Sequence, residues 1–340
     1  MVFQASTYYT LASVGLAFGT FQQLGKSCTK FLDPLIQQGI DNPYVLDTFH
    51  KTGVRSVDTF LSFITPFFDA VLLKTGSLGT VSLIAIFSTA TAWFTFASIE
   101  SLRDRSKGLV KQVALVGLIG QLLGISVSFP LLWLSSFFFY KLHEKMKAND
   151  SSYVKPAGVY TAAASNLIFL LFTVSLGVVK NDSTRKLLIA IFQIAPVVFY
   201  TLPVYLHFDS NHVSLQVSRK GSEAVKKVYQ LSALAFAVTH IGTCLYILQF
   251  PFITFGDFIK LLTTANPGPE GCAAFLLLEY FSLSVASLLY IASQGDITAV
   301  KKYLIQSVAV GPAAAFMLFT SKREQELIDE IDRINQNKKK

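Results

Sequence analysis

The sequence predicts an all-α protein, a polytopic bundle of eight or nine transmembrane helices. Hydrophobic residues make up 52% of the 340 residues and charged residues only 15%, whereas a soluble domain carries about 25% charged residues. Long apolar runs recur along the whole chain, and most approach the roughly 20 residues that a helix needs to cross a bilayer. The Lys and Arg residues lie almost wholly between these runs, as in loops that face lipid headgroups.

Nine apolar runs are candidates for these helices. They cover residues 8–24, 58–73, 83–100, 113–140, 157–179, 187–206, 228–250, 272–293 and 303–319. The first run is short and rich in Gly and Thr, so the predicted number of helices is eight or nine. The run 113–140 is longer than one span needs, and a tilt or a kink at Pro130 would accommodate the excess. Pro196 and Pro203 indicate a broken helix over 187–206.

The predicted domain organisation has two parts. Residues 1–320 form a single transmembrane helical domain, and residues 321–340 form a polar, charged C-terminal tail. Leu327, Ile331 and Ile334 recur at helical spacing in this tail, which predicts a solvated helix on the surface. Residues 251–271, rich in Phe and Leu before an Asn-Pro-Gly-Pro turn, are typical of an interfacial helix or lid.

Composition limits the partners and cofactors. A formal charge of +8 without a compact basic patch fits a lipid bilayer as partner and gives no support for nucleic-acid binding. Three cysteines make no disulfide framework, and the N-terminus lacks the basic segment of a cleavable signal peptide. The sequence contains no phosphate-binding loop, nucleophile elbow or HExxH motif, so we expect neither a cofactor nor a metal.

Glu279 is the most informative residue of the sequence. It is the one charged residue in the run 272–293 and lies about two turns inside it. A carboxylate at that depth costs about 2.5–3.5 kcal/mol on insertion scales, and such residues usually mark functional sites. The alternative is a protonated or hydrogen-bonded glutamate that joins two helices. We predict that Glu279 is the catalytic acid and that it is largely protonated.

Two further acids lie on the predicted helix 58–73. Asp58, Ser62, Thr65 and Asp69 are spaced by four, three and four residues, which places them on one helical stripe. The alternative for Asp58 is a helix N-cap. The alternative for Asp69 is an ion pair with Lys74 near the membrane surface. We predict that both aspartates belong to the substrate pocket.

The helix 83–100 ends in an aromatic segment that contains another acid. Trp93, Phe96, Ala97 and Glu100 share one helical face. Glu100 is either an interfacial acid paired with Arg103 or a proton donor kept neutral beside the indole ring. We predict Glu100 as the catalytic partner of Glu279 and Trp93 as a pocket residue.

Polar and aromatic residues inside the apolar runs also favour an internal pocket. His240 lies within the run 228–250, where a single histidine is either a hydrogen-bonding group between helices or a pocket residue. Further buried polar groups are expected at Gln112, Gln121, Asn166, Gln193 and Tyr200. The 30 Phe residues mostly face lipid, but ring faces would also stabilise a cation inside an apolar cavity.

Three segments carry a family resemblance. The segments are WFTFASIESLR (93–103), the FFD end of the second run (67–69) and FLLLEYFSLSVASLLYIAS (275–293). They resemble fungal integral-membrane terpene cyclases of meroterpenoid pathways, and related membrane proteins of polyketide clusters proposed to open epoxides. The resemblance implies that one acid in an early helix and one in a late helix protonate an epoxide or olefin, without metal or diphosphate loss. The matching positions are Glu100 and Glu279, with Tyr280 following as the aromatic pocket residue.

The buried acids and the resemblance together imply a membrane-bound cyclase, which we expect in the endoplasmic reticulum membrane. Its substrate would be a small hydrophobic molecule, a prenylated aromatic or polyene epoxide, which is opened by a buried carboxylic acid and then cyclises. Two alternatives remain, a membrane epoxide hydrolase of a polyketide pathway and a proton-coupled transporter or lipid-binding membrane protein. We predict that the second, third and eighth of these helices adjoin, so that Asp58 or Asp69, Glu100 and Glu279 face one internal cavity.

Overall fold

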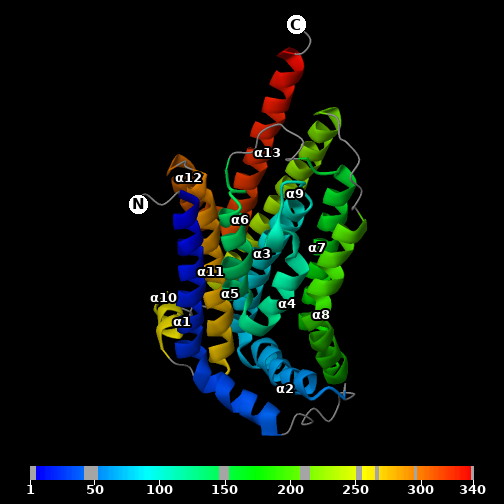
Figure 1. The fold of residues 1–340 in the computed structure, drawn as a ribbon. Helices are drawn as coiled ribbons and strands as arrows, with labels where there is room; N and C mark the ends of the chain where they lie inside the picture. Colours follow the sequence, from blue (N-terminus) through cyan, green and yellow to red (C-terminus); the bar gives the residue numbers. More distant parts are fainter. Residues whose placement is uncertain are drawn as a thin grey trace.

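Helices form nearly all of the described chain (Figure 1). The computed structural model describes residues 5–41, 53–144, 153–206, 215–249, 255–264, 268–294 and 297–337, and no β-strand occurs within these ranges. The helices are α1 (Ala5–Asp41), α2 (Arg55–Asp69), α3 (Gly76–Ser101), α4 (Val113–Leu123), α5 (Ile125–Ser128), α6 (Ser135–Phe139), α7 (Pro156–Val178), α8 (Asp182–Leu206), α9 (Leu215–Leu248), α10 (Phe255–Thr263), α11 (Glu270–Ser293), α12 (Ile297–Val310) and α13 (Pro312–Asn337). The predicted all-α class is confirmed.

The number of predicted membrane spans is not confirmed. Six helical segments of the described chain are long and apolar enough to cross a membrane: Arg55–Lys74, Gly76–Ser101, Pro156–Leu176, Asp182–Tyr200, Ser218–Leu248 and Glu270–Ser293. The run 113–140 forms two shorter apolar helices, Val113–Leu123 and Ile125–Phe139. Six long apolar helices are compatible with a membrane protein, and they do not confirm the count of eight or nine.

The helices α3 and α11 form the centre of the bundle. α11 packs between α1 and α3, α4 packs against α8, and α13 packs along α9 (Figure 1). The short helix α10, which lies within the predicted interfacial segment, packs its Leu261 against Ala273 and Leu277 of α11. α11 is therefore held on several sides, which fixes the direction in which its single internal acid points.

The interior beside α3 and α11 is an aromatic core around Trp93. The Trp93 side chain is fully buried, with its ring centroid 4.6 Å from that of Phe316 and 5.0 Å from that of Phe129. Its indole Nε1 donates a hydrogen bond to the carbonyl of Leu283 on α11 at 3.0 Å. A buried indole needs such a partner, and this bond ties α3 to α11. Trp93 thus has a packing role.

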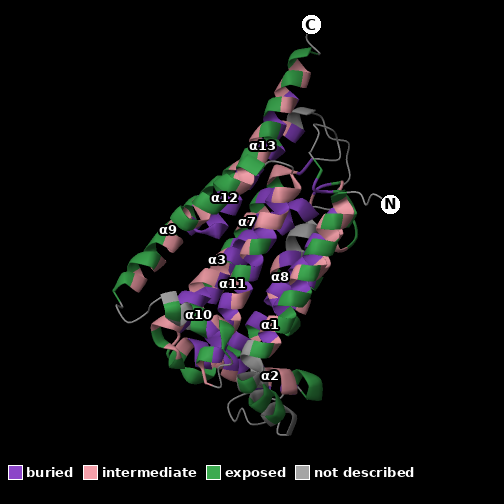
Figure 2. Ribbon diagram, turned by 90° about the vertical axis from the view of Figure 1, so that its left-hand side faces the viewer, coloured by how far each residue is buried: buried purple, intermediate pink, exposed green. Residues whose placement is uncertain are grey.

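The outer surface of the bundle is strongly apolar. On α9, Leu231, Leu234, Val238, Ile241 and Leu245 are all exposed (Figure 2). A monomeric soluble protein rarely exposes a contiguous apolar patch of more than a few hundred Å². This stripe fits a helix that faces lipid tails.

The C-terminal segment 321–340 differs from the predicted solvated helix. α13 continues without a break through residue 320, and Leu327 and Ile331 are buried, with exposed fractions of 2% and 0%. Their spacing gives α13 an apolar face, which packs against α9 rather than facing solvent. Ion pairing between Arg219 Nε and Asp332 Oδ1 at 2.7 Å adds to this contact.

The expected break in the helix over 187–206 is absent. α8 runs continuously from Asp182 to Leu206 through Pro196 and Pro203. The chain instead breaks within the run 113–140, at Gly124, and forms a π-helical turn, Phe129–Leu134, at Pro130. The Ser13 hydroxyl on α1 donates to the carbonyl of Pro130 at 2.7 Å. Neighbouring helices that satisfy freed backbone groups make such irregular turns tolerable in a membrane.

Candidate active site

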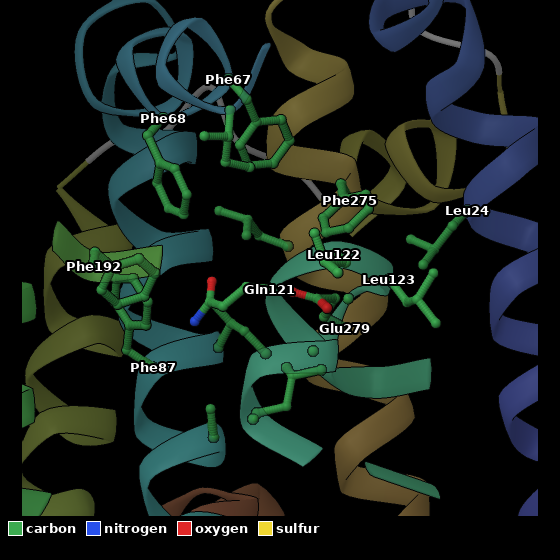
Figure 3. Close-up of a pocket in the computed structure, with 18 of the residues that line it drawn as sticks. Leu24, Phe67, Phe68, Phe87, Gln121, Leu122, Leu123, Phe192, Phe275 and Glu279 are labelled. Carbon is green, nitrogen blue, oxygen red and sulfur yellow. The ribbon is translucent and has the colours of Figure 1, made fainter. Parts of the chain in front are cut away.

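A cavity of about 350 Å³ lies next to Glu279 (Figure 3). Its walls come from α1, α2, α3, α4, α5, α7, α8 and α11. This volume is typical of small-molecule sites, which span roughly 300–1,000 Å³. Eight phenylalanines line it: Phe21, Phe67, Phe68, Phe87, Phe94, Phe169, Phe192 and Phe275. Among the described lining residues, only Gln121 and Glu279 have polar side chains, and both point into the cavity.

Glu279 has no basic partner in the described part of the chain. Its side chain is 95% buried on α11, since the exposed fraction is 5%, and no described Lys or Arg forms an ion pair with it. The nearest donors are backbone groups, because the N–H of Ser126 lies 3.4 Å from Glu279 Oε1. A carboxyl group in such surroundings can donate a proton to a bound molecule.

The break at Gly124 brings these backbone donors to Glu279. Gly124 has φ +87° and ψ 138°, a conformation that is almost restricted to glycine. α4 ends before it, and the N–H groups of Val127 and Ser128 both bond to the Gly124 carbonyl. The preceding N–H groups, those of Ile125 and Ser126, have no carbonyl one turn earlier, and they face the Glu279 carboxyl group.

This break in the helix was not predicted from the sequence. A glycine inside a long apolar run is compatible with a continuous helix, and Pro130 was the more obvious irregularity. The signal in the sequence was the length of the run 113–140, which exceeds one span by several residues. Only the neighbourhood of Glu279 shows why the chain turns at Gly124.

We expect Gly124→Ala to reduce both stability and activity. A Cβ atom at this position would lie 2.7 Å from Glu279 Oε1, and the backbone strain adds about 1–3 kcal/mol. The measurements are the midpoint of thermal unfolding in detergent and the turnover of a bound substrate. Gly242→Ala is the matched control, because a Cβ atom there meets nothing within 4 Å in a helix. Equal behaviour of the two variants would show that the break does not depend on glycine.

The structure places Glu100 in a different site from Glu279. Glu100 Oε1 accepts a bond from Arg103 Nε at 2.9 Å, and its carboxylate also pairs with Arg323 of α13. Arg323 in turn bonds to the Tyr290 hydroxyl. Tyr290 is eleven residues beyond Glu279 on α11, about 16 Å along the helix axis. The prediction that Glu100 and Glu279 share a cavity is therefore wrong.

Glu100 belongs to a buried ionic cluster of two glutamates and three arginines. The cluster consists of Glu100, Arg103, Arg105, Arg323 and Glu324. Arg103 Nη2 lies 2.6 Å from Glu324 Oε1, and both side chains are fully buried. Burial alone would lower the pKa of Arg103, but the carboxylates of Glu100 and Glu324 outweigh it and raise the pKa above its ordinary value. Arg103 therefore stays charged, and the cluster joins the end of α3 to α13.

The aspartates of α2 share the predicted stripe but do not line the cavity. Asp58, Ser62 and Thr65 are buried, and Asp69 has a side-chain exposure of 17%. Asp69 Oδ1 accepts from Arg185 Nε of α8 at 2.9 Å, so its partner is not Lys74, the partner considered from sequence. Asp58 lies in the first turn of α2 rather than at its N-cap, which is Val54.

His240 and Tyr280 lie at a second, smaller pocket of about 40 Å³. Consecutive helical residues are about 100° apart, so Tyr280 faces away from the cavity that Glu279 lines. His240 packs against Gly311, a positive-φ residue between α12 and α13, and its Nε2 lies 3.7 Å from Cys244 Sγ. Cys244 follows His240 by four residues, one helical turn, and this pairing was not predicted. The described residues contain no group of three metal ligands.

Comparison with known proteins gives a family but no close relative. The chain matches the CtvD domain over residues 1–263. No curated protein and no solved structure matches it. The matched stretch contains Gln121 and Gly124, whereas Glu279 lies beyond it. Because the match spans well over half of the sequence, the chain belongs to the CtvD-domain family, which is named after a protein of a fungal secondary-metabolite cluster.

Proposed function

We propose that this protein is a membrane-bound catalyst that opens an epoxide in a hydrophobic substrate and lets the substrate cyclise. The observation that carries the proposal is Glu279, a carboxyl group without a basic partner among the described residues, at a cavity lined by phenylalanines. The substrate class is a prenylated aromatic or polyene epoxide. Membership of a family named after a secondary-metabolite protein supports this class.

The reaction begins with proton transfer from Glu279. The carboxyl proton moves to the epoxide oxygen while the bond from that oxygen to the more substituted carbon breaks, which leaves a hydroxyl group and a developing cation. The faces of Phe67, Phe94 and Phe275 supply negative potential to this cation. An internal hydroxyl or alkene then attacks the cationic carbon and closes the ring. A proton lost from that intermediate returns to the carboxylate, so substrate and product are isomers.

The cavity wall also suggests how a hydrophobic substrate enters. Phe21, Leu122 and Leu123 line the cavity and are exposed at the outer surface, with exposed fractions of 56%, 61% and 43%. Apolar side chains at an opening favour entry of a membrane-dissolved molecule over a water-soluble one. Gln121, the second polar side chain, is available to orient a hydroxyl group of the substrate through its amide.

The proposal is tested with membranes that contain the full-length protein. Epoxidised polyenes and epoxidised prenyl phenols are incubated with these membranes and with matched membranes that lack it, and products are separated by mass. We expect a product isomeric with the substrate, formed only when the protein is present. A product heavier by one water would favour the epoxide hydrolase alternative instead. Unchanged epoxide in both preparations would contradict the catalytic proposal. The location of the protein in the endoplasmic reticulum membrane is a separate prediction, which this experiment does not address.

A further inference from the structure

We propose that Ser126, together with the start of the helix Ile125–Phe139, holds the carboxylate that remains on Glu279 after proton transfer, so that Glu279 serves as both acid and base. The inference rests on the proposed function and deepens it. Ser126 is then a positioning residue: it acts on Glu279 and not on the substrate.

The first support is the direction of the helix start. The break at Gly124 leaves the N–H groups of Ile125 and Ser126 without intrahelical acceptors, and the N–H of Ser126 lies 3.4 Å from Glu279 Oε1. Helix N-termini favour negative charge through these free donors and through the helix dipole. The distance is long for a hydrogen bond with a neutral carboxyl group and would shorten once the carboxylate forms.

The second support is an unused donor at the same place. The Ser126 side chain is fully buried, and its Oγ has no hydrogen-bond partner among the described residues. The backbone N–H of the same residue lies 3.4 Å from Glu279 Oε1, which places this hydroxyl near the carboxyl group. Buried hydroxyl groups are usually hydrogen-bonded, and an exception in a protein interior calls for an explanation. A hydroxyl that gains its acceptor only after Glu279 ionises accounts for this one.

The third support is the shortage of other bases in the cavity. Ring closure releases a proton from the attacking hydroxyl or from a carbon next to the cation, and a group in the cavity must take it. Gln121 is the only other polar side chain among the described lining residues, and an amide is a poor base. Glu100 is held by arginines in the separate ionic cluster. The carboxylate of Glu279 therefore recovers the proton that it gave.

This inference differs from the two-carboxylate arrangement expected from the sequence. In the single-acid arrangement, the donors at Ser126 stabilise a charge that exists only between the two proton transfers. Such donors act on the transition state and the intermediate rather than on substrate binding. Their removal should lower kcat and leave KM unchanged.

The test compares three serine variants in membranes, with the epoxide that the parent protein converts. We expect Ser126→Ala to lower kcat by about 10²-fold, the lower end of the typical loss for one oxyanion donor, with the same KM. Ser126→Thr, which keeps the hydroxyl, should restore most of kcat. Ser128→Ala is the matched control, because Ser128 is an equally buried serine on α5 whose Oγ also has no partner among the described residues.

The outcomes separate this inference from the proposed function. Parent-like kcat in Ser126→Ala, or an equal loss in Ser128→Ala, would overturn the role of Ser126 while Glu279 could still be the acid. A rise in KM with unchanged kcat would overturn it too, because the hydroxyl would then act in binding. If Glu279→Gln is fully active, the proposed function itself fails, and the inference fails with it.

Discussion

Glu279→Gln is expected to remove substrate conversion while the protein stays folded and inserted in the membrane. Glutamine nearly matches glutamic acid in volume and can accept the bond from the Ser126 N–H. It cannot donate an acidic proton, and general acid catalysis typically contributes about 10²–10⁴-fold to the rate. Because the remaining described lining is almost wholly apolar, no neighbouring acid can replace it. We therefore expect a loss of at least about 10²-fold.

The measurement is conversion of an epoxide in open membranes, where transport across the bilayer has no influence on product formation. Glu270→Gln is the matched control, because Glu270 lies in the first turn of the same helix and is exposed. This control should keep the parent rate and the parent yield. Parent-like turnover by Glu279→Gln would identify Glu279 as a hydrogen-bonding residue between helices.

Among the variants proposed here, Arg103→Met is expected to lower the free energy of unfolding the most. Methionine has an unbranched side chain that can fill part of the space, but it leaves Glu100 and Glu324 without an arginine that pairs with both. Removal of one partner from a buried ion pair typically costs about 3–5 kcal/mol, because the other charge stays buried and uncompensated. The remaining arginines, Arg105 and Arg323, compensate only in part. We expect a sharply reduced yield of folded protein.

The measurement is thermal unfolding in detergent, followed by near-UV circular dichroism and by retention of a monodisperse elution peak. Arg219→Met is the matched control. Arg219 of α9, like Arg103, pairs with an acid of α13, in this case Asp332, but its side chain is 40% exposed. An exposed ion pair contributes about 0–1 kcal/mol. If both variants unfold at the same temperature, the buried cluster does not hold α13 to α3. Partial recovery by adding Glu324→Gln to Arg103→Met would show that the stranded carboxylate causes the loss.

These two predictions concern acids that looked alike in the sequence. Glu100 and Glu279 each lie at a helical segment rich in aromatic residues, and each has a plausible role as proton donor. The structure separates them because partners far along the chain decide their surroundings. Arg323, which pairs with Glu100, is 223 residues away from it. Glu279 meets the helix start at Ser126, 153 residues away, and no described basic side chain.

The sequence by itself determined the properties that depend on local composition and period. Long apolar runs with few charges can only form helices whose apolar surface is buried against other helices or faces lipid. This composition predicted an all-α membrane protein. The same argument identified Glu279, because a carboxylate inside an apolar helix costs free energy whichever neighbour the helix packs against. The polar stripe of α2 is a further local property, and its residues Asp58, Ser62 and Thr65 are indeed buried together.

Only the tertiary structure decided how these elements face one another. Helical period fixes which residues share a face but not which neighbour covers that face, so the C-terminal segment with Leu327 and Ile331 packs along α9 instead of facing solvent. The break at Gly124 has the same origin. A glycine in an apolar run permits a turn without requiring one, and the turn is used because the freed N–H groups meet Glu279 of α11. Local sequence sets what each segment can do, and the packing of distant segments selects which of these possibilities has the lowest free energy.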